Sequence, residues 1–103
     1  MPKKMNGVYR ALSDPTRRRV LELLRERDMT AGELAAHFDQ SRPTLTGHFN
    51  VLKDAGLVQT DRRGTRVVYH LNLSVLEDAM LALMSTFRIE PNGRARGRTE
   101  RRQ

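Results

Sequence analysis

Basic and small polar side chains gather in two short stretches of the sequence, residues 42–53 and residues 62–66. On a helical wheel that turns Leu45, Phe49 and Leu52 inward, the first stretch carries its polar side chains on the opposite side. Guanidinium, amide and hydroxyl groups arranged in this way suit the base edges and phosphates of double-stranded DNA. The side chains that we expect to contact DNA are Arg42, Pro43, Thr44, Thr46, Gly47, His48, Asn50, Lys53, Arg62, Arg63, Thr65 and Arg66.

Each type of side chain in these stretches suits a particular contact. Arg42 can pair with guanine through two hydrogen bonds and Asn50 can do so with adenine, and the base that each one reads stays open. The three arginines at residues 62–66 suit phosphates or a narrow minor groove. His48, which borders the polar face of this helix, is either a phosphate contact or an ordinary surface or half-buried histidine. Gly47 costs a helix about 1 kcal/mol relative to alanine, and either close approach to DNA or crowding between helices would account for it.

The other chemically active residue types do not form a recognisable site. The sequence has no cysteine, which excludes disulfides, thiolate metal sites and a cysteine nucleophile. His37, His48 and His70 fall on different predicted elements, without a partner at metal-ligand spacing. No pair of carboxylates, nucleophile with its base or phosphate-binding glycine loop can be assembled. We therefore expect no metal, no cofactor and no enzymatic activity.

The composition favours a single domain with an anionic partner. The 103 residues include 19 Lys and Arg against 12 Asp and Glu, a net charge of +7. This excess favours nucleic acid or an anionic membrane as a partner. No run of about 18 apolar residues and no secretory signal is found, so we expect a cytoplasmic protein.

The charge is unevenly distributed along the chain. We expect residues 1–89 to form the domain, and residues 90–103 to be a disordered basic tail because no large apolar side chain follows Ile89. The tail either strengthens DNA binding or only raises solubility. The arginine run at residues 17–19 is more typical of a solvated helix face than of a DNA contact.

The first half of the sequence carries clear helix starts. Asp14-Pro15 provides a cap and a first-turn proline for a helix that continues to about Arg27. Thr30 and Glu33 form a capping box, with Met29 and Leu34 as a hydrophobic staple, for a helix that ends near Phe38. Ser41 caps the polar helix described above, which Ala55-Gly56 ends. A short helix from about Met5 to Leu12 precedes them all.

The second half predicts a hairpin and a final helix. Residues 57–62 and 66–72 have strand character, and Gly64 lies where a hairpin would turn, so we expect a two-stranded ribbon. Ser74 and Glu77 indicate a second capping box, for a helix that continues to about Arg88. The order α-α-α-α-β-β-α predicts a mainly α protein with a small β-hairpin, a winged helix-turn-helix.

The final helix is apolar over well over half of its circumference, which is more than the core of so small a domain can cover. The extra apolar face therefore predicts packing on a second copy of the chain, together with the first helix. A helix fully enclosed within a monomer is the alternative. The residues expected in the dimer interface are Val8, Tyr9, Leu12, Val75, Leu76, Ala79, Met80, Leu83, Met84 and Phe87.

Four segments in register, ALSDPTRRRVLELL, TAGELAAHF, SRPTLTGHFNVLKDAGLV and RRGTRVVYHLN, resemble the ArsR/SmtB family of winged-helix transcriptional repressors. The resemblance covers roughly residues 5–88, and the N-terminal half is most similar to the family's autorepressor branch. It implies a homodimer on an operator with two-fold symmetry. The helix after Ser41 would enter the major groove, and the ribbon tip would touch the neighbouring backbone or minor groove.

The resemblance does not extend to the metal sites of the family. Metal-sensing members use cysteines near the helix-turn-helix or the N-terminus, or histidine and acidic ligands on the last helix. This sequence has no cysteine, and its last helix has Glu77 and Asp78 but no histidine. The resemblance therefore implies a repressor that does not sense metals through these sites, whose signal is an unknown effector or partner protein.

The resulting hypothesis is a sequence-specific, homodimeric transcriptional repressor of double-stranded DNA. The alternative is a winged-helix module that binds another protein and whose DNA binding is vestigial. Single-stranded RNA binding is disfavoured, since Phe38, Phe49 and Phe87 fall at the spacing of helix core residues rather than on a stacking platform.

Overall fold

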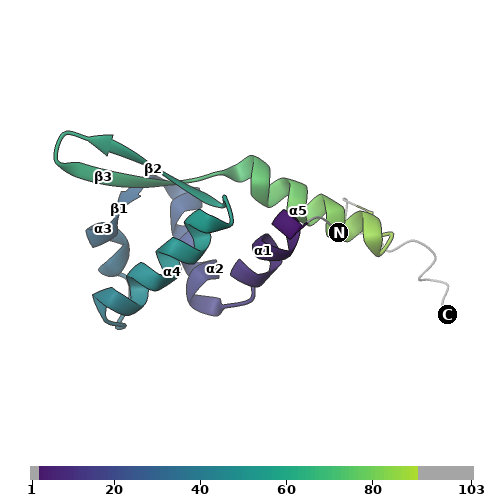
Figure 1. Cartoon of the computed structure of the whole chain (residues 1–103), viewed down its shortest axis with the longest axis horizontal. Helices are drawn as coiled ribbons and strands as arrows, with labels where there is room; N and C mark the ends of the chain where they lie inside the picture. The colour runs from purple at the N-terminus through teal and green to yellow at the C-terminus, as the bar shows by residue number, and fades with distance from the viewer. Residues whose placement is uncertain (1–2, 91–103) are drawn as a thin grey trace.

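The computed structural model describes residues 3–90, and the side chains from Met5 onward. The described residues form five helices and a three-stranded antiparallel sheet (Figure 1). A hairpin extends beyond the helices at one end of the molecule, and the last helix extends in the opposite direction (Figure 1). In chain order the elements are α1 (Lys3–Ala11), α2 (Pro15–Glu26), β1 (Met29–Thr30), α3 (Ala31–Ala35), α4 (Arg42–Asp54), β2 (Val58–Arg63), β3 (Arg66–Leu71) and α5 (Leu73–Thr86).

Three of the predicted helix starts are confirmed by their caps. The Asp14 side chain accepts a hydrogen bond from the backbone N–H of Arg17 at the start of α2. At α3, Thr30 and Glu33 make both hydrogen bonds of the capping box. The Ser41 side chain accepts from the N–H of Thr44 at the start of α4. Each cap satisfies a backbone donor that the first helical turn leaves without a partner.

Two predicted helix boundaries are wrong. The helix after Thr30 ends at Ala35 rather than near Phe38, because the N–H groups of His37 and Phe38 bond three residues back and close separate turns. The last helix does not begin with a capping box at Ser74. Its N-cap is Asn72, and the Ser74 hydroxyl donates to Asn72 Oδ1 at 3.0 Å from inside the first turn.

The predicted two-stranded ribbon is part of a three-stranded sheet in the order β1-β3-β2. Met29 pairs with Tyr69 and Thr30 with Val68. These two residues were predicted only as a staple and a cap. Because a cap residue is extended before its helix begins, its backbone is free to pair with a neighbouring strand. The hairpin itself is confirmed. Each strand begins and ends within one residue of the predicted bounds, and the chain turns at Gly64, whose φ is +65°.

The core lies between α2, α3, α4 and the sheet. Leu45, Phe49 and Leu52 are buried as predicted, and the Phe49 ring lies 5.4 Å from that of Tyr69 on β3. Val8 from α1 and Ala79 from α5 join this core, at 1% and 0% exposure. Both were predicted in the dimer interface. The structure instead covers their side chains within the subunit, where they attach the first and last helices to the body.

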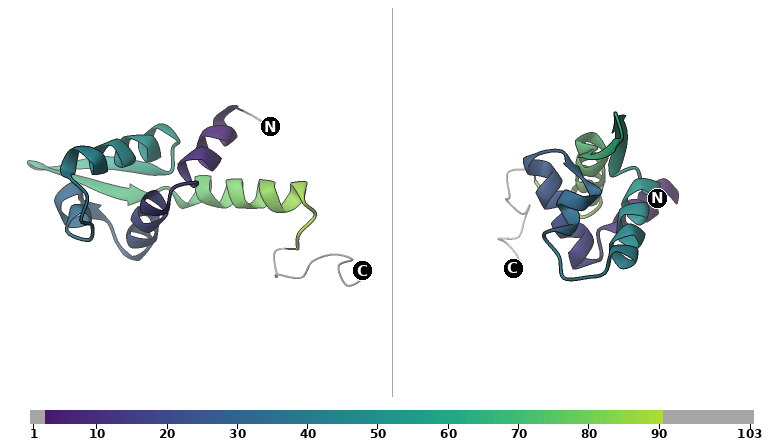
Figure 2. Two further views of the ribbon diagram at one scale, coloured as in Figure 1. Left: turned by 90° about the horizontal axis from the view of Figure 1, so that it is seen from below. Right: turned by 90° about the vertical axis from the view of Figure 1, so that its left-hand side faces the viewer.

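The C-terminal part of α5 extends away from the body as a rod (Figure 2). Ala79 is the only buried residue of the helix. Phe87, predicted at core spacing, lies just after the helix and is 68% exposed. Phe87 therefore does not pack in the core of the single chain, and its exposure is compatible with its predicted place in the dimer interface.

Candidate DNA-binding surface

The outward face of α4 presents most of the predicted contact residues to solvent. Its inner face is held by buried Leu45, Phe49 and Leu52, which fixes the rotation of the helix about its axis. Arg42, Thr46 and Asn50 are four residues apart, so they form one row along the exposed surface. The residues of α4 that are exposed are Arg42, Pro43, Thr44, Thr46, Gly47, Asn50, Lys53 and Asp54.

Gly47 does not relieve crowding inside the subunit. A Cβ atom added at Gly47 would meet nothing within 4 Å. The alternative of helix-helix crowding is therefore wrong for the described part of the chain. The flat surface that Gly47 leaves at the middle of α4 is compatible with a second molecule that comes close to the backbone.

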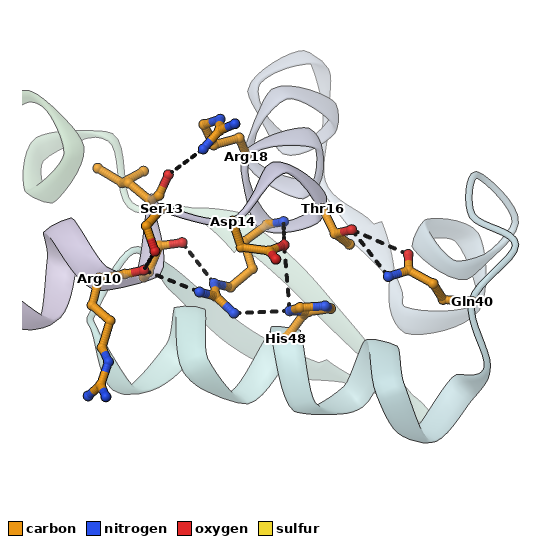
Figure 3. A network of polar contacts seen from close by, with 10 residues as sticks. Arg10, Ser13, Asp14, Thr16, Arg18, Gln40 and His48 are labelled. Carbon is orange, nitrogen blue, oxygen red and sulfur yellow. Dashed lines mark hydrogen bonds and ion pairs between the residues drawn. The ribbon is translucent and has the colours of Figure 1, made fainter.

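His48 lies apart from this face, contrary to the prediction that it borders the DNA-contacting side. Its side chain is 17% exposed and turns toward the start of α2, where Asp14 lies (Figure 3). His48 Nδ1 is 3.1 Å from Arg17 Nη1 and 3.9 Å from Asp14 Oδ2. Arg17, expected on a solvated helix face together with its two neighbours, is instead partly buried against α1 and α4.

Asp14 is the carboxylate of this cluster. Burial raises the pKa of its carboxyl, but the hydrogen bond from the Arg17 N–H and the nearby His48 lower the pKa by more, so the net pKa lies below the ordinary value of 3.8. Asp14 is therefore ionised at neutral pH. It combines the N-cap of α2 with a negative charge beside the two basic side chains.

The arginines of the hairpin do not form a single cluster at its tip. The strand register pairs Arg62 with Val67 and Arg63 with Arg66, and successive residues of a strand point to opposite faces. Arg62 therefore shares a face with Tyr69, the face toward α4. Arg63 and Arg66 lie on the other face.

Acidic residues accompany the two arginines on that second face. Arg63 Nη2 is 3.8 Å from Asp28 Oδ2 and 4.0 Å from Asp61 Oδ2. Arg66 Nη2 is 4.0 Å from Glu33 Oε1. The sequence alone did not indicate Asp28 and Glu33 as partners, because the fold brings the segment around β1 and α3 to the hairpin from more than thirty residues away. Exposed ion pairs at such distances contribute little, and salt or a phosphate can replace them.

Glu33 has a second role in this arrangement. The backbone N–H of Thr30 donates to Glu33 Oε1 at 2.8 Å and lowers the pKa of the carboxyl, and Arg27 and Arg66 lower it further. Because its pKa is lowered, Glu33 is ionised at neutral pH, and the capping box holds its carboxylate in place. It therefore presents a fixed negative charge to Arg66.

The described residues hold no group of three His, Cys, Asp or Glu side chains that could bind a metal ion. His70 Nε2 instead lies 3.3 Å from Asp61 Oδ2 on the neighbouring strand. His37 is exposed at the end of α3. The predicted basic tail, from residue 91 onward, lies outside the described residues.

A second exposed surface follows α5. Leu73, Leu76, Met80, Leu83 and Phe87 recur at spacings of three and four residues, the pattern of helices that pack on a partner helix. Met80 is 37% exposed, and Tyr9 of α1 donates to the Ala79 carbonyl at 3.3 Å beside the stripe. Leu81 is more exposed, at 53%, but its row neighbours Glu77 and Ser85 are polar.

Comparison with known proteins finds similarity along most of the chain. Residues 14–60 match the family model for bacterial regulatory proteins of the arsR family. The transcriptional repressor SdpR of Bacillus subtilis is 47% identical over 76 residues, which cover 74% of this chain and 84% of that protein.

Solved structures of ArsR-family regulators are also similar to this chain. The crystal structure of an ArsR family transcriptional regulator matches with a TM-score of 0.75 and 32% identity, over 84% of this chain and 88% of that one. The solution structure of a homodimeric winged helix-turn-helix DNA-binding domain from Mycobacterium bovis matches with a TM-score of 0.67 and 25% identity, over 81% and 78%.

Proposed function

Because the chain belongs to the ArsR family of bacterial transcriptional regulators, we propose that it is a homodimeric repressor that binds a two-fold symmetric operator in double-stranded DNA. The observation that carries the proposal is the exposed polar row on α4, above an inner face fixed in the core. This helix lies in the major groove, and a dimer bound to the operator excludes RNA polymerase from the promoter.

The side chains of α4 divide into those that read bases and those that bind phosphates. Arg42, at the start of the helix, and Asn50, two turns later, reach base edges. Thr46 lies between them. Pro43 and Gly47 have small side chains or none, so the DNA can come close to this part of the helix. Lys53, at the other end, meets the phosphate backbone. The backbone N–H of Thr44 donates to Ser41 Oγ at 3.3 Å, so Thr44 is held in the first turn of α4 by the helix cap.

The hairpin anchors the protein beside the groove. Arg62, on the face toward α4, binds the backbone phosphates or the minor groove. Arg63 and Arg66 leave Asp28 and Glu33 to add contacts where the DNA comes within reach. Thr65 at the turn is exposed and offers a hydroxyl.

The dimer forms through the first and last helices. The apolar stripe of α5 faces its equivalent in the second subunit, because Leu73, Met80 and Phe87 are left exposed by the described part of the chain. Tyr9 of α1, which bonds the Ala79 carbonyl, and Leu12, which follows α1 and lines a pocket with Leu76, lie beside α5. The remaining proposed contacts, now without Val8 and Ala79, are Val75, Leu76, Met80, Leu83, Met84 and Phe87.

The rest of the assignment follows from this function. Residues 1–89 are the DNA-binding and dimerisation domain, with residues 90–103 as a basic extension. The protein acts in the cytoplasm, where its operator lies, and has no catalytic activity. No helix among residues 3–90 is long and apolar enough to cross a membrane. An effector or partner protein releases the DNA.

Selection of bound sequences from a pool of random duplexes tests the proposal. The expected product is a sequence with two-fold symmetry, with half-site centres about 10 bp or about 20 bp apart. Repeating the selection with zinc and with a chelator should return the same sequence. Equal retention of all duplexes at physiological salt would contradict the proposal.

A further inference from the structure

Arg17, in the first turns of α2, contacts both the end of α1 and the middle of α4. Its Nε donates to the Ala11 carbonyl at 2.8 Å and its Nη2 to the Arg10 carbonyl at 3.2 Å, both in the last turn of α1. Its Nη1 lies 3.1 Å from His48 Nδ1 on α4. A single planar guanidinium therefore connects the end of α1 with the middle of α4.

The chemistry of these groups fixes the direction of each bond. Helix carbonyls in the last turn have no partner within the helix, and a positive charge beside them is favourable. Arginine can only donate, so His48 Nδ1 must accept, and the neutral imidazole then carries its proton on Nε2. Asp14, 3.9 Å from Nδ1 and ionised, is the other charged group that lies against the ring.

The same end of α2 also holds the segment that leads into α4. Thr16 and Gln40 hydrogen-bond through their side chains at 3.2 Å (Figure 3). Gln40 lies two residues before the first residue of α4. The recognition helix is thus held from α2 at two places, before its start and at its second turn.

We infer that Arg17 and His48 are positioning residues that couple α1, and with it the dimer, to the orientation of α4 on DNA. The inference rests on the proposed function. The apolar side of α4 fixes its rotation about its own axis, but the two α4 helices of a dimer must also keep a defined separation to meet both half-sites of one duplex. The guanidinium supplies a rigid connection from the dimer helix to the reading helix, without touching DNA itself.

The inference predicts which variants lose affinity. Arg17→Lys keeps the charge but cannot reach α1 and His48 together, because its ammonium lacks the planar fork. His48→Leu removes only the acceptor on α4. Each should weaken binding to the selected operator about tenfold, the usual effect of losing one charge-assisted hydrogen bond. The double variant should be no weaker than either single variant, since both remove the same connection.

Two further variants separate this role from a general loss of packing or of charge. His48→Gln offers a side-chain oxygen that can accept from Arg17 and should restore most of the affinity. Arg18→Lys is the matched control, because within residues 3–90 the Arg18 side chain donates to the Leu12 carbonyl at 2.9 Å and makes no hydrogen bond to α4. It should bind as the wild type does. All variants should remain folded dimers by circular dichroism and sedimentation at the assay concentration.

Nitrogen-15 NMR of the wild-type protein near pH 7.5 tests the connection without any variant. The expected spectrum shows His48 neutral with an unprotonated Nδ1; a proton on Nδ1 would overturn the inference even if a variant failed to fold. Additive losses from Arg17→Lys and His48→Leu, or no loss, would overturn it as well. If the wild type selects no duplex, the proposed function fails and the inference with it, whereas an operator-selective wild type with unaffected variants refutes the inference alone.

Discussion

The two long helices α4 and α5 expose opposite chemistry from similar lengths of chain. The 13 residues of α4 bury one apolar stripe completely and show polar side chains to solvent. The 14 residues of α5 bury only Ala79 and leave an apolar stripe that is largely exposed. An exposed polar row suits a polar, charged surface such as DNA, and an exposed apolar stripe suits a second copy of itself. What a helix binds is therefore decided by the face that its own subunit leaves uncovered.

The largest expected effect comes from removing the inner support of α4. Phe49 is 1% exposed and packs on Tyr69. Phe49→Ala should lower the free energy of unfolding by about 3 to 5 kcal/mol, because it leaves a cavity in the core. Urea denaturation measures this loss. A loss of less than about 1 kcal/mol in the free energy of unfolding would mean that Phe49 does not hold the inner face of α4 in the core.

The second effect breaks the apolar stripe of α5. Met80→Glu should weaken the dimer by about 2 to 4 kcal/mol, since it places a charge in the proposed interface. The matched control is Leu81→Glu, whose side chain is more exposed in the single chain but lies between Glu77 and Ser85. Sedimentation at several concentrations should show dissociation for Met80→Glu alone. Equal weakening by both variants would place the interface elsewhere on the helix.

The third effect tests the polar row of α4. Arg42→Ala should cost about 1 to 3 kcal/mol of operator affinity and relax the preference at one base position of each half-site. Titration against the selected operator and against point-substituted duplexes measures both quantities. If affinity falls equally for every duplex, Arg42 is a phosphate contact rather than a base contact.

A smaller effect distinguishes the two faces of the hairpin. Arg62→Ala should weaken binding to all duplexes uniformly and reduce the slope of log affinity against log salt by about one. Arg63→Ala should have less effect, because Arg63 must first leave Asp28. Salt titrations of the two variants make this comparison. A larger loss for Arg63→Ala would reverse the assignment of the faces.

The smallest effect concerns the cap of α2. The pKa of Asp14 is lowered in the folded chain, so its contribution to stability is complete at neutral pH and is lost as the pH falls through the folded-state value, below 3.8. Asp14→Asn keeps a capping side chain without this titration. Between pH 7 and pH 3 the variant should therefore lose less stability than the wild type in thermal unfolding. An equal loss of stability in the variant and the wild type would mean that Asp14 does not contribute to the acid sensitivity of the fold.

The sequence predicted those features that depend on local signals. The caps at Asp14, Thr30 and Ser41 and the inner stripe of α4 each need only a few neighbouring residues, and all are confirmed. The family followed from four short segments in register. The length and apolar pattern of α5 were also visible in the sequence, although its N-cap was misplaced by two residues.

The remaining features depend on contacts between distant residues. The pairing of Thr30 with Val68 needs a strand nearly forty residues away, and a two-residue strand has no periodicity of its own. The turn of His48 toward Arg17 depends on how α2 crosses α4, which no wheel of a single helix contains. The separation of Arg62 from Arg63 and Arg66 follows from the strand register, in which a shift of one residue exchanges the two faces.

We propose that two copies of α4 bind one duplex together. Sedimentation equilibrium of the full chain with the selected operator duplex, at physiological salt, measures the number of chains per duplex most directly. We expect two chains on each duplex, and no complex of comparable affinity with a single half-site. A complex with one chain per duplex, at the same affinity, would show that the protein does not bind its operator as a dimer.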